Sequence, residues 1–344
     1  MFCRNKLLLF LVMLQFCSLT LFGFTFSGQG ASYPYKLYQQ TFKDYYKSKK
    51  TTVNYNPTSS RDGFFSIQDQ RVDFAGVDLF VSDELMETLP SPHKLLHIPT
   101  CLSGIGMAYH LKGVSSLKLS ASLLSKIYRG KITTWNHPDI VAVNPGITLP
   151  DLNIVLIRRA GGSGSSFIFT QYLTIMDSIW RDTIGTTATL QPFNSLAVDT
   201  SSSMGKMISQ VNGSIGYIGY GFKHDFSLSF AHIENLSGNF IEPTLDSISA
   251  SAEIEIPEDA RVFCTSTPSE YGYPLSSFSW IIFYQEQHYA KRSKAFVKQF
   301  KHFLSFMIDN SVNHSQIGYA KLPQNVKVRS KSILEKITYK GKPL

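Results

Sequence analysis

The sequence predicts a mixed α/β protein built from two domains. Its 344 residues exceed the length of one average domain. Short apolar or alternating runs recur between stretches with helical spacing, as in proteins whose strands and helices alternate along the chain. The apolar content of 43% is ordinary and the aromatic content of 13% is high, so a large packed core is expected.

Strands are predicted wherever a short apolar or alternating run lies between turn residues. The runs that satisfy this condition are 52–55, 72–77, 95–98, 104–110, 153–157, 214–218 and 279–284.

Helices are predicted between these strands from apolar residues at helical spacing. The first begins at Pro34, because proline fits the first turn of a helix. Two others are expected over 117–128 and 204–211. A long helix over 289–307 has phenylalanines on one side and Lys and Arg on the other. That pattern fits a membrane surface or, as we expect, packing on the protein core.

The N-terminus has the features of a secretory signal peptide. Arg4 and Lys6 precede the apolar run 7–14, which matches a basic region followed by a hydrophobic one. We place the end of the signal peptide approximately at residue 23. The alternative is an uncleaved anchor that reaches Phe26. The sequence therefore predicts a periplasmic or secreted protein, with a membrane tether as the alternative.

Charge and cysteine content narrow the classes of partner. Without Arg4 and Lys6 of the leader, 31 Lys and Arg residues remain against 25 Asp and Glu, a mild excess that favours anionic ligands. No long Lys/Arg run or nucleic-acid motif accompanies it, so we expect no nucleic-acid partner. Cys101 and Cys264 form either one disulfide bond or two buried free thiols.

The most informative stretch is 158–173, where a predicted strand leads into a loop of small residues and then into a helix. Arg158 and Arg159 stand before the loop, and the apolar residues of the following helix recur at i, i+3, i+4 and i+7. Arginine side chains match tetrahedral oxyanions, glycines let the backbone approach closely, and a helix N-terminus presents free N–H groups. This arrangement indicates a site for a phosphate-like anion.

Two other loops have the same composition and also precede helices. One is 28–34, before the helix at Pro34, and the other is 58–63, after the strand 52–55. A single such loop is explained by ordinary helix capping. Three of them, together with the arginine pair, favour an anion site.

Asp78 follows the strand 72–77 and is open to two interpretations. A buried Asp78 accepts a hydrogen bond from the proton of monohydrogen phosphate, whereas sulfate has no such proton and is repelled. From spacing alone, a surface cap or a salt-bridge aspartate is the better supported interpretation.

These stretches resemble the phosphate-binding proteins of bacterial ABC importers, the PstS type. Order and spacing agree over about nine tenths of the chain after the leader. The stretches that carry the resemblance are 28–34, 72–74 with Asp78 and 82–84, 127–132 with Trp135, 144–146, 158–173 and 213–217.

The resemblance implies a two-domain periplasmic-binding-protein fold of the Venus-flytrap kind. Domain I combines residues 24–100 with 272–344, domain II spans 101–271, and crossing strands form the hinge. Phosphate sits in the cleft, and the domains close over it. The partners implied are inorganic phosphate and the membrane permease subunits of an ABC importer. The resemblance implies a monomer without cofactor or metal.

The ligand contacts that the resemblance implies come from all three loops and from the residue after the strand 72–77. Asp78 accepts the phosphate proton, and Ser32 and Ser165 replace threonines that are common in the family. The full set is Ala31, Ser32, Tyr33, Ser60, Asp78, Arg159, Ser163, Gly164 and Ser165.

One position departs from the family and bears on selectivity. The family usually has an aspartate directly after Arg-Arg-Ala, where it braces the ligand arginine, and this chain has Gly161. We therefore expect a less firmly held Arg159 and a site that is more tolerant of other oxyanions, unless Asp62 or another carboxylate substitutes. The segment 200–203 also departs from the family, and we expect no ligand contact from it.

Two other functions remain open. A phosphomonoesterase requires a strong nucleophile or a metal, but 162–165 lacks the Gly-x-Ser-x-Gly elbow. His93 and His97 have i, i+4 spacing without the acid of a zinc-protease motif, so we expect no metal and no enzyme. The other alternative is a secreted phosphate sensor or scavenger that uses the same fold without an importer.

Overall fold

The computed structural model describes residues 23–89, 94–309 and 314–344. Residues 1–22 of the expected leader and His93 lie outside the described residues. None of the described helices is both long and apolar enough to cross a membrane.

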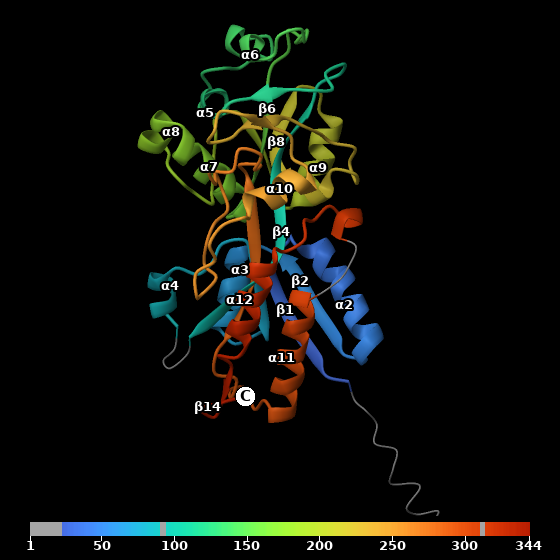
Figure 1. The fold of residues 1–344 in the computed structure, drawn as a ribbon. Helices are drawn as coiled ribbons and strands as arrows, with labels where there is room; N and C mark the ends of the chain where they lie inside the picture. Colours follow the sequence, from blue (N-terminus) through green and yellow to red (C-terminus); the bar gives the residue numbers. More distant parts are fainter. Residues whose placement is uncertain (1–22, 90–93, 310–313) are drawn as a thin grey trace, which may run out of the picture.

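A nine-stranded sheet runs through the molecule (Figure 1). Eight of its strands follow one path, and β9 (Ser229–Phe230) pairs with β4 beside that path. In order across the sheet, the eight are β2 (Thr52–Thr58), β1 (Thr25–Ala31), β3 (Phe74–Val77), β12 (Ser276–Tyr284), β4 (Leu95–His110), β8 (Ser214–Gly219), β6 (Val155–Arg159) and β7 (Ser195–Val198).

Strand β4 joins the two halves of this sheet. Its residues 95–104 pair with β12, and its residues 105–110 pair with β8. Strands β1, β2 and β3 are parallel in one half, and β6, β7 and β8 are parallel in the other. Each half therefore has the strand arrangement of an α/β protein, as the sequence predicts.

Helices flank both halves of the sheet (Figure 1). The half with β1 to β3 has α2 (Tyr35–Lys49), α3 (Ser60–Gln68), α4 (Asp83–Glu87), α11 (Lys294–Asp309) and α12 (Gln324–Leu334). The half with β6 to β8 has α5 (Ala121–Tyr128), α6 (Pro138–Val143), α7 (Gly164–Met176), α8 (Ser178–Thr183), α9 (Ser201–Gln210) and α10 (Leu245–Ser251). Short elements complete the described chain: β5 (Lys118–Leu119), β10 (His232–Glu234) and β11 (Phe240–Ile241) in a small sheet, β13 (Thr338–Tyr339) with β14 (Lys342–Pro343), and the 3₁₀ turns η1 (Tyr220–Phe222) and η2 (His314–Ile317).

Several predicted boundaries are wrong for local reasons. The runs 95–98 and 104–110 form one strand, because the pairing with β12 shifts register next to Pro99 and lets the strand continue past the proline. The helix expected from residue 117 begins at Ala121, because the Ser120 hydroxyl caps it by accepting from Leu123 N–H (3.2 Å). The helix expected from residue 289 begins at Lys294.

Strand β1 was not predicted, and it also rules out the long anchor. Its glycines suggested a loop, but Gly28 packs against the ring of Phe74 and Gly30 against Gly76, so both lie in the sheet. Phe26 is fully buried in β1. The alternative of a membrane anchor that reaches Phe26 is therefore wrong.

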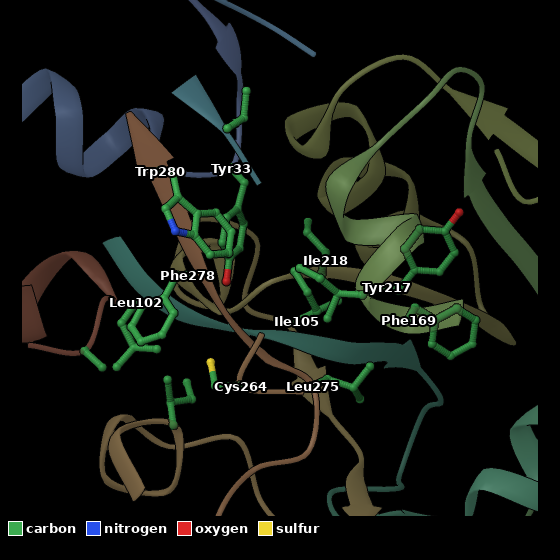
Figure 2. Packing of buried hydrophobic residues seen from close by; sticks show 14 of the residues in the cluster. Tyr33, Leu102, Ile105, Phe169, Tyr217, Ile218, Cys264, Leu275, Phe278 and Trp280 are labelled. Atoms are coloured by element: carbon green, nitrogen blue, oxygen red, sulfur yellow. The ribbon is translucent and has the colours of Figure 1, made fainter. Parts of the chain in front are cut away.

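The apolar face of α11 packs on this buried strand. The Phe26 ring lies 5.3 Å from the ring of Phe300 and 5.4 Å from that of Phe303. Packing on the core, rather than on a membrane, is confirmed for this helix face. Elsewhere in the core, Figure 2 shows Phe278 and Trp280 along β12 with the Cys264 thiol nearby. Cys101 and Cys264 are buried free thiols, so the disulfide alternative is wrong.

Candidate functional site

Three helix starts converge on one small cavity. The sheet brings them together, because β1, β2 and β3 are parallel neighbours and their carboxyl ends meet at one edge. Ala31 and Thr58 are register partners at that edge, and Asp78 follows β3 directly. Strand β6 approaches from the other half of the sheet and ends at Arg159.

The free space between the residues that line the cavity is about 200 Å³, which includes space that is open to solvent. All nine residues expected at the ligand line it, and Thr58 and Ser59 line it as well. Its full lining is Ala31, Ser32, Tyr33, Thr58, Ser59, Ser60, Asp78, Arg159, Ser163, Gly164 and Ser165. The structure brings these residues together, and their contact with a ligand stays a prediction.

The first turn of α7 has backbone N–H groups that make no hydrogen bond within the helix. Ser163 is the N-cap residue, but its hydroxyl does not cap the helix. Its N–H donates to Ala188 O (2.9 Å), and the first N–H bonded back to Ser163 O is that of Phe167. The N–H groups of Gly164 and Ser165 thus belong to the unpaired first turn of the helix, where the helix dipole favours an anion.

Asp78 is buried, with 4% of its surface exposed. Its Oδ1 accepts from the Ser279 hydroxyl (2.6 Å), and its backbone N–H donates to Ser60 Oγ (3.0 Å). Burial raises the pKa of Asp78 to about 7, while the hydrogen bond from Ser279 and the charge of Arg159 lower the pKa in part. The interpretation of Asp78 as a surface cap or salt-bridge residue is therefore wrong.

Arg159 is the buried cation of the cavity, with 7% of its surface exposed. Its Nη2 donates to the backbone oxygen of Asp199 (2.7 Å) and its Nη1 to Ser163 Oγ (3.4 Å). Its Nε is buried and has no hydrogen-bond partner among the described residues. No carboxylate of the described residues forms an ion pair with the Arg159 guanidinium. Asp62 does not take the place of the missing aspartate among the described residues: its carboxylate forms no ion pair with Arg159 and accepts instead from the Ser59 hydroxyl (2.8 Å).

The two neighbouring arginines of the motif have different positions. Arg158 donates from Nε to Oγ of Ser195 in β7 (3.0 Å) and does not line the cavity. Successive residues of a strand point to opposite faces, so only one of the two guanidiniums reaches the anion cavity.

Gly164 and Asp78 meet across the cavity wall. A methyl group at position 164 would lie 2.2 Å from Cβ of Asp78, which is closer than any real contact. Gly161 is the opposite case, because a methyl group there would have no neighbour within 4 Å. Gly164 is therefore required for the approach of α7 to β3, and Gly161 leaves open space beside Arg159.

Two residues that support the site were not predicted. Ser279 of β12 positions Asp78, and the Tyr217 hydroxyl of β8 accepts from Arg159 N–H (3.3 Å) and from the Ser166 hydroxyl (2.9 Å). The sequence contained a signal for Ser279, because serines occur in the apolar run 276–284 and a hydroxyl in a buried strand requires a hydrogen-bond partner.

No group of three or more metal-binding side chains occurs within the described residues. His97 has a structural role there: its Nε2 accepts from Val81 N–H (2.9 Å), and burial lowers its pKa to about 3. A neutral, hydrogen-bonded imidazole in the core explains this histidine without a metal.

The sequence model of the family described as "PBP superfamily domain" matches residues 23–311. A protein named "Phosphate-binding protein PstS" from Haemophilus influenzae is 32% identical over 261 residues, 74% of this chain and 77% of its own. One with the same name from Pasteurella multocida is 28% identical over 327 residues, 94% of this chain and 93% of its own.

The fold is shared with solved structures. The "high affinity periplasmic phosphate-binding protein (PfluDING)", solved with phosphate bound, superposes with a TM-score of 0.72 at 20% identity, covering 90% of this chain and 93% of that one. The fold and the matched residues define a protein of the PBP superfamily. Within it, the chain belongs to the PstS family of phosphate-binding proteins.

The contact between Gly164 and Asp78 gives a first prediction. Gly164→Ala forces the two residues apart, and such overpacking costs about 1–3 kcal/mol. We expect the affinity for inorganic phosphate to fall about tenfold to hundredfold, measured by calorimetry. Gly161→Ala is the matched control and leaves the affinity unchanged. Equal affinities for both variants would contradict a need for close approach at position 164.

The raised pKa of Asp78 gives a second prediction. Between about pH 4 and 7, the folded protein without ligand retains a proton that the unfolded chain releases, so the free energy of unfolding falls as the pH rises through this window. Asp78→Asn removes this penalty. Above pH 7, we expect the variant to be more stable than the wild type by up to about 4 kcal/mol, with no difference below about pH 4.

Urea unfolding at several pH values, without phosphate, measures this effect. Asp151→Asn removes one carboxylate at an exposed position and is the control for the loss of a charge. A variant at position 78 that is less stable than the wild type at pH 8 would show that the ionised carboxylate stabilises the fold.

Proposed function

We propose that this chain is an exported solute-binding protein that captures inorganic phosphate and delivers it to an ABC importer. One observation carries the proposal: three helix starts, one buried guanidinium and one buried carboxyl group surround a cavity suited to one small anion. Membership of the PstS family makes the chain a phosphate-binding protein rather than an enzyme. Export to the periplasm is supported by the predicted signal peptide.

The cavity residues offer the anion three kinds of contact: a positive charge, hydrogen-bond donors and one hydrogen-bond acceptor. Arg159 supplies the positive charge. The hydroxyls of Ser32, Ser60 and Ser163 donate, and so do the N–H groups at the starts of α2 and α7. Asp78 is the acceptor, and it takes a hydrogen bond from a phosphate that still carries a proton. These groups replace the water around the ion.

The two halves of the sheet act as two domains. Domain I is 24–100 with 272–344, and domain II is 101–271. The continuous pairing of β4 with β12 and then with β8 supports a hinge made of these strands. The cavity takes Asp78 from one domain and Arg159 from the other, so closure on phosphate joins them.

Delivery to permease subunits distinguishes an importer component from a sensor or scavenger. The family supports the importer. Genes for two permeases and an ATPase beside this gene would agree with it, and loss of phosphate uptake on deletion of the gene tests it directly.

The division of roles between the two arginines gives a third prediction. Arg159→Ala removes charged hydrogen bonds to the anion, each worth about 1.5–3 kcal/mol, so phosphate affinity falls about a thousandfold. Arg158→Ala is a matched control, because it removes the same charge one residue away from the cavity. Calorimetry with phosphate measures both variants. Equal losses for the two would mean that net charge, and not contact, governs binding.

Anion selectivity gives a fourth prediction. Asp78→Asn removes the repulsion of sulfate, so the ratio of phosphate affinity to sulfate affinity falls. Gly161→Asp places a carboxylate in the open space beside Arg159 and raises this ratio about fivefold.

Gly162→Asp adds the same charge where the side chain would point to Thr189, and it serves as the control. Phosphate, arsenate and sulfate affinities are measured side by side. If the wild type is strictly selective for phosphate and Gly161→Asp does not change this selectivity, the expectation that Gly161 makes the site tolerant of other oxyanions is contradicted.

A further inference from the structure

A dense group of lysines lies at one end of the molecule. Three segments, 43–50, 291–301 and 335–342, hold twelve Lys and Arg residues and only two acids, Asp44 and Glu335. We call the exposed lysines of these segments that form no ion pair within the described residues the basal surface; Lys47 is exposed but pairs with Asp44. The members of the basal surface are Lys43, Lys49, Lys50, Lys291, Lys294, Lys298, Lys336, Lys340 and Lys342.

The three segments lie side by side around the point where the described chain begins. Gly23 packs against the backbone of Lys50, and the Phe24 ring lies 5.9 Å from that of Phe296 on α11. The Tyr339 hydroxyl donates to the backbone oxygen of Arg292 (3.1 Å), so the hairpin β13–β14 covers the loop before α11. Figure 1 shows β14, α11 and the C-terminus at this end, opposite α5 and α6.

Acids of the chain do not neutralise the basal surface. Asp44 pairs with Lys47 and Glu335 with Lys301. Glu286 lies beneath the hairpin, where its carboxylate accepts from the N–H groups of His288, Lys340 and Gly341. The nine lysines of the basal surface have no ion pair within the part of the chain that the structure describes.

Phosphate binding does not use this charge. Strand β1 separates the basal surface from Ala31 at the cavity by about 20 Å, and exposed charges are screened within about 8–10 Å at physiological ionic strength. The apolar face of α11 is already buried against β1, so the lysines on its exposed side are free to contact a partner.

The sequence before Gly23 indicates which partner this is. The apolar run 7–14 is suited to a membrane, and eight residues, 15–22, connect Leu14 to Gly23. Such a connection spans at most about 30 Å. While the leader is attached and its apolar run lies in a bilayer, the described chain begins within this distance of the lipid headgroups, and it begins at the basal surface.

We propose that the basal surface binds anionic lipid headgroups and orients the protein on the membrane. Lysines in three separate segments suit a broad charged surface, since each contributes attraction without a defined pocket. Bound in this way, the half with β6 to β8 points away from the lipid. This surface is separate from the phosphate cavity, and it holds with or without the proposed import role.

Vesicle binding by the protein recovered from cells that express the full chain tests the proposal. Vesicles of phosphatidylcholine with phosphatidylglycerol are compared with phosphatidylcholine alone, at low and at high salt. The variant Lys49→Glu, Lys294→Glu, Lys342→Glu changes one residue in each segment. The control Lys112→Glu, Lys131→Glu, Lys206→Glu makes the same change in net charge on exposed lysines of the other half.

We expect salt-sensitive binding of the wild type to anionic vesicles only. The basal variant loses about a hundredfold in partition, at about fivefold for each lysine, and the control stays within about twofold of the wild type. Phosphate affinity is unchanged in both variants, which separates this test from that of the phosphate site and shows that both fold.

Three results would overturn the proposal. One is an equal loss of vesicle binding in the basal variant and in the control, which would show that net charge governs binding. The second is equal, salt-insensitive binding to neutral vesicles, which would assign it to the apolar leader. The third is binding to polyglutamate without binding to vesicles, which would assign the surface to an acidic protein.

Discussion

The cavity is built around two buried groups of opposite charge, Asp78 and Arg159, that form no ion pair with each other. Asp78 and Arg159 are both removed from water, and neither forms an ion pair within the described residues. The desolvation of Asp78 is opposed in part by the Ser279 hydroxyl and by the field of Arg159. Such a cavity is incomplete on its own, because a buried charge without a partner is costly. An anion that satisfies both groups stabilises the arrangement.

Close backbone contacts make this burial possible. Gly30, Gly63 and Gly76 pack against one another, so β1, β3 and α3 approach more closely than side chains would allow. Gly164 brings the start of α7 against Asp78. Four positions without a side chain therefore bring the elements around the cavity close together.

The buried charges of the cavity and the exposed charges of the basal surface suit different ligands. The cavity holds a single buried cation, which is partly balanced by a buried carboxyl group, and this suits selective binding of one ion. The basal surface holds many exposed cations with no counterion of their own, which suits a broad and weakly specific partner. About one strand length separates the two, so each charge acts on its own ligand.

Local signals in the sequence determined the α/β class, most of the strands and the three loop-to-helix junctions, whereas the nine residues expected at the ligand came from the resemblance to the PstS family. Capping serines, small residues and apolar periods act over a few positions, so the sequence alone contains them. Only the tertiary structure decided that Asp78 is buried, because its partner Ser279 is 201 residues away. The resemblance pointed to Arg159 rather than Arg158, and the structure gives the physical reason: residues alternate along β6, and the neighbouring strands decide which face meets the cavity. Strand β1 escaped prediction for the same reason: its glycines are stable in the sheet only because Phe74 and Gly76 lie beside them.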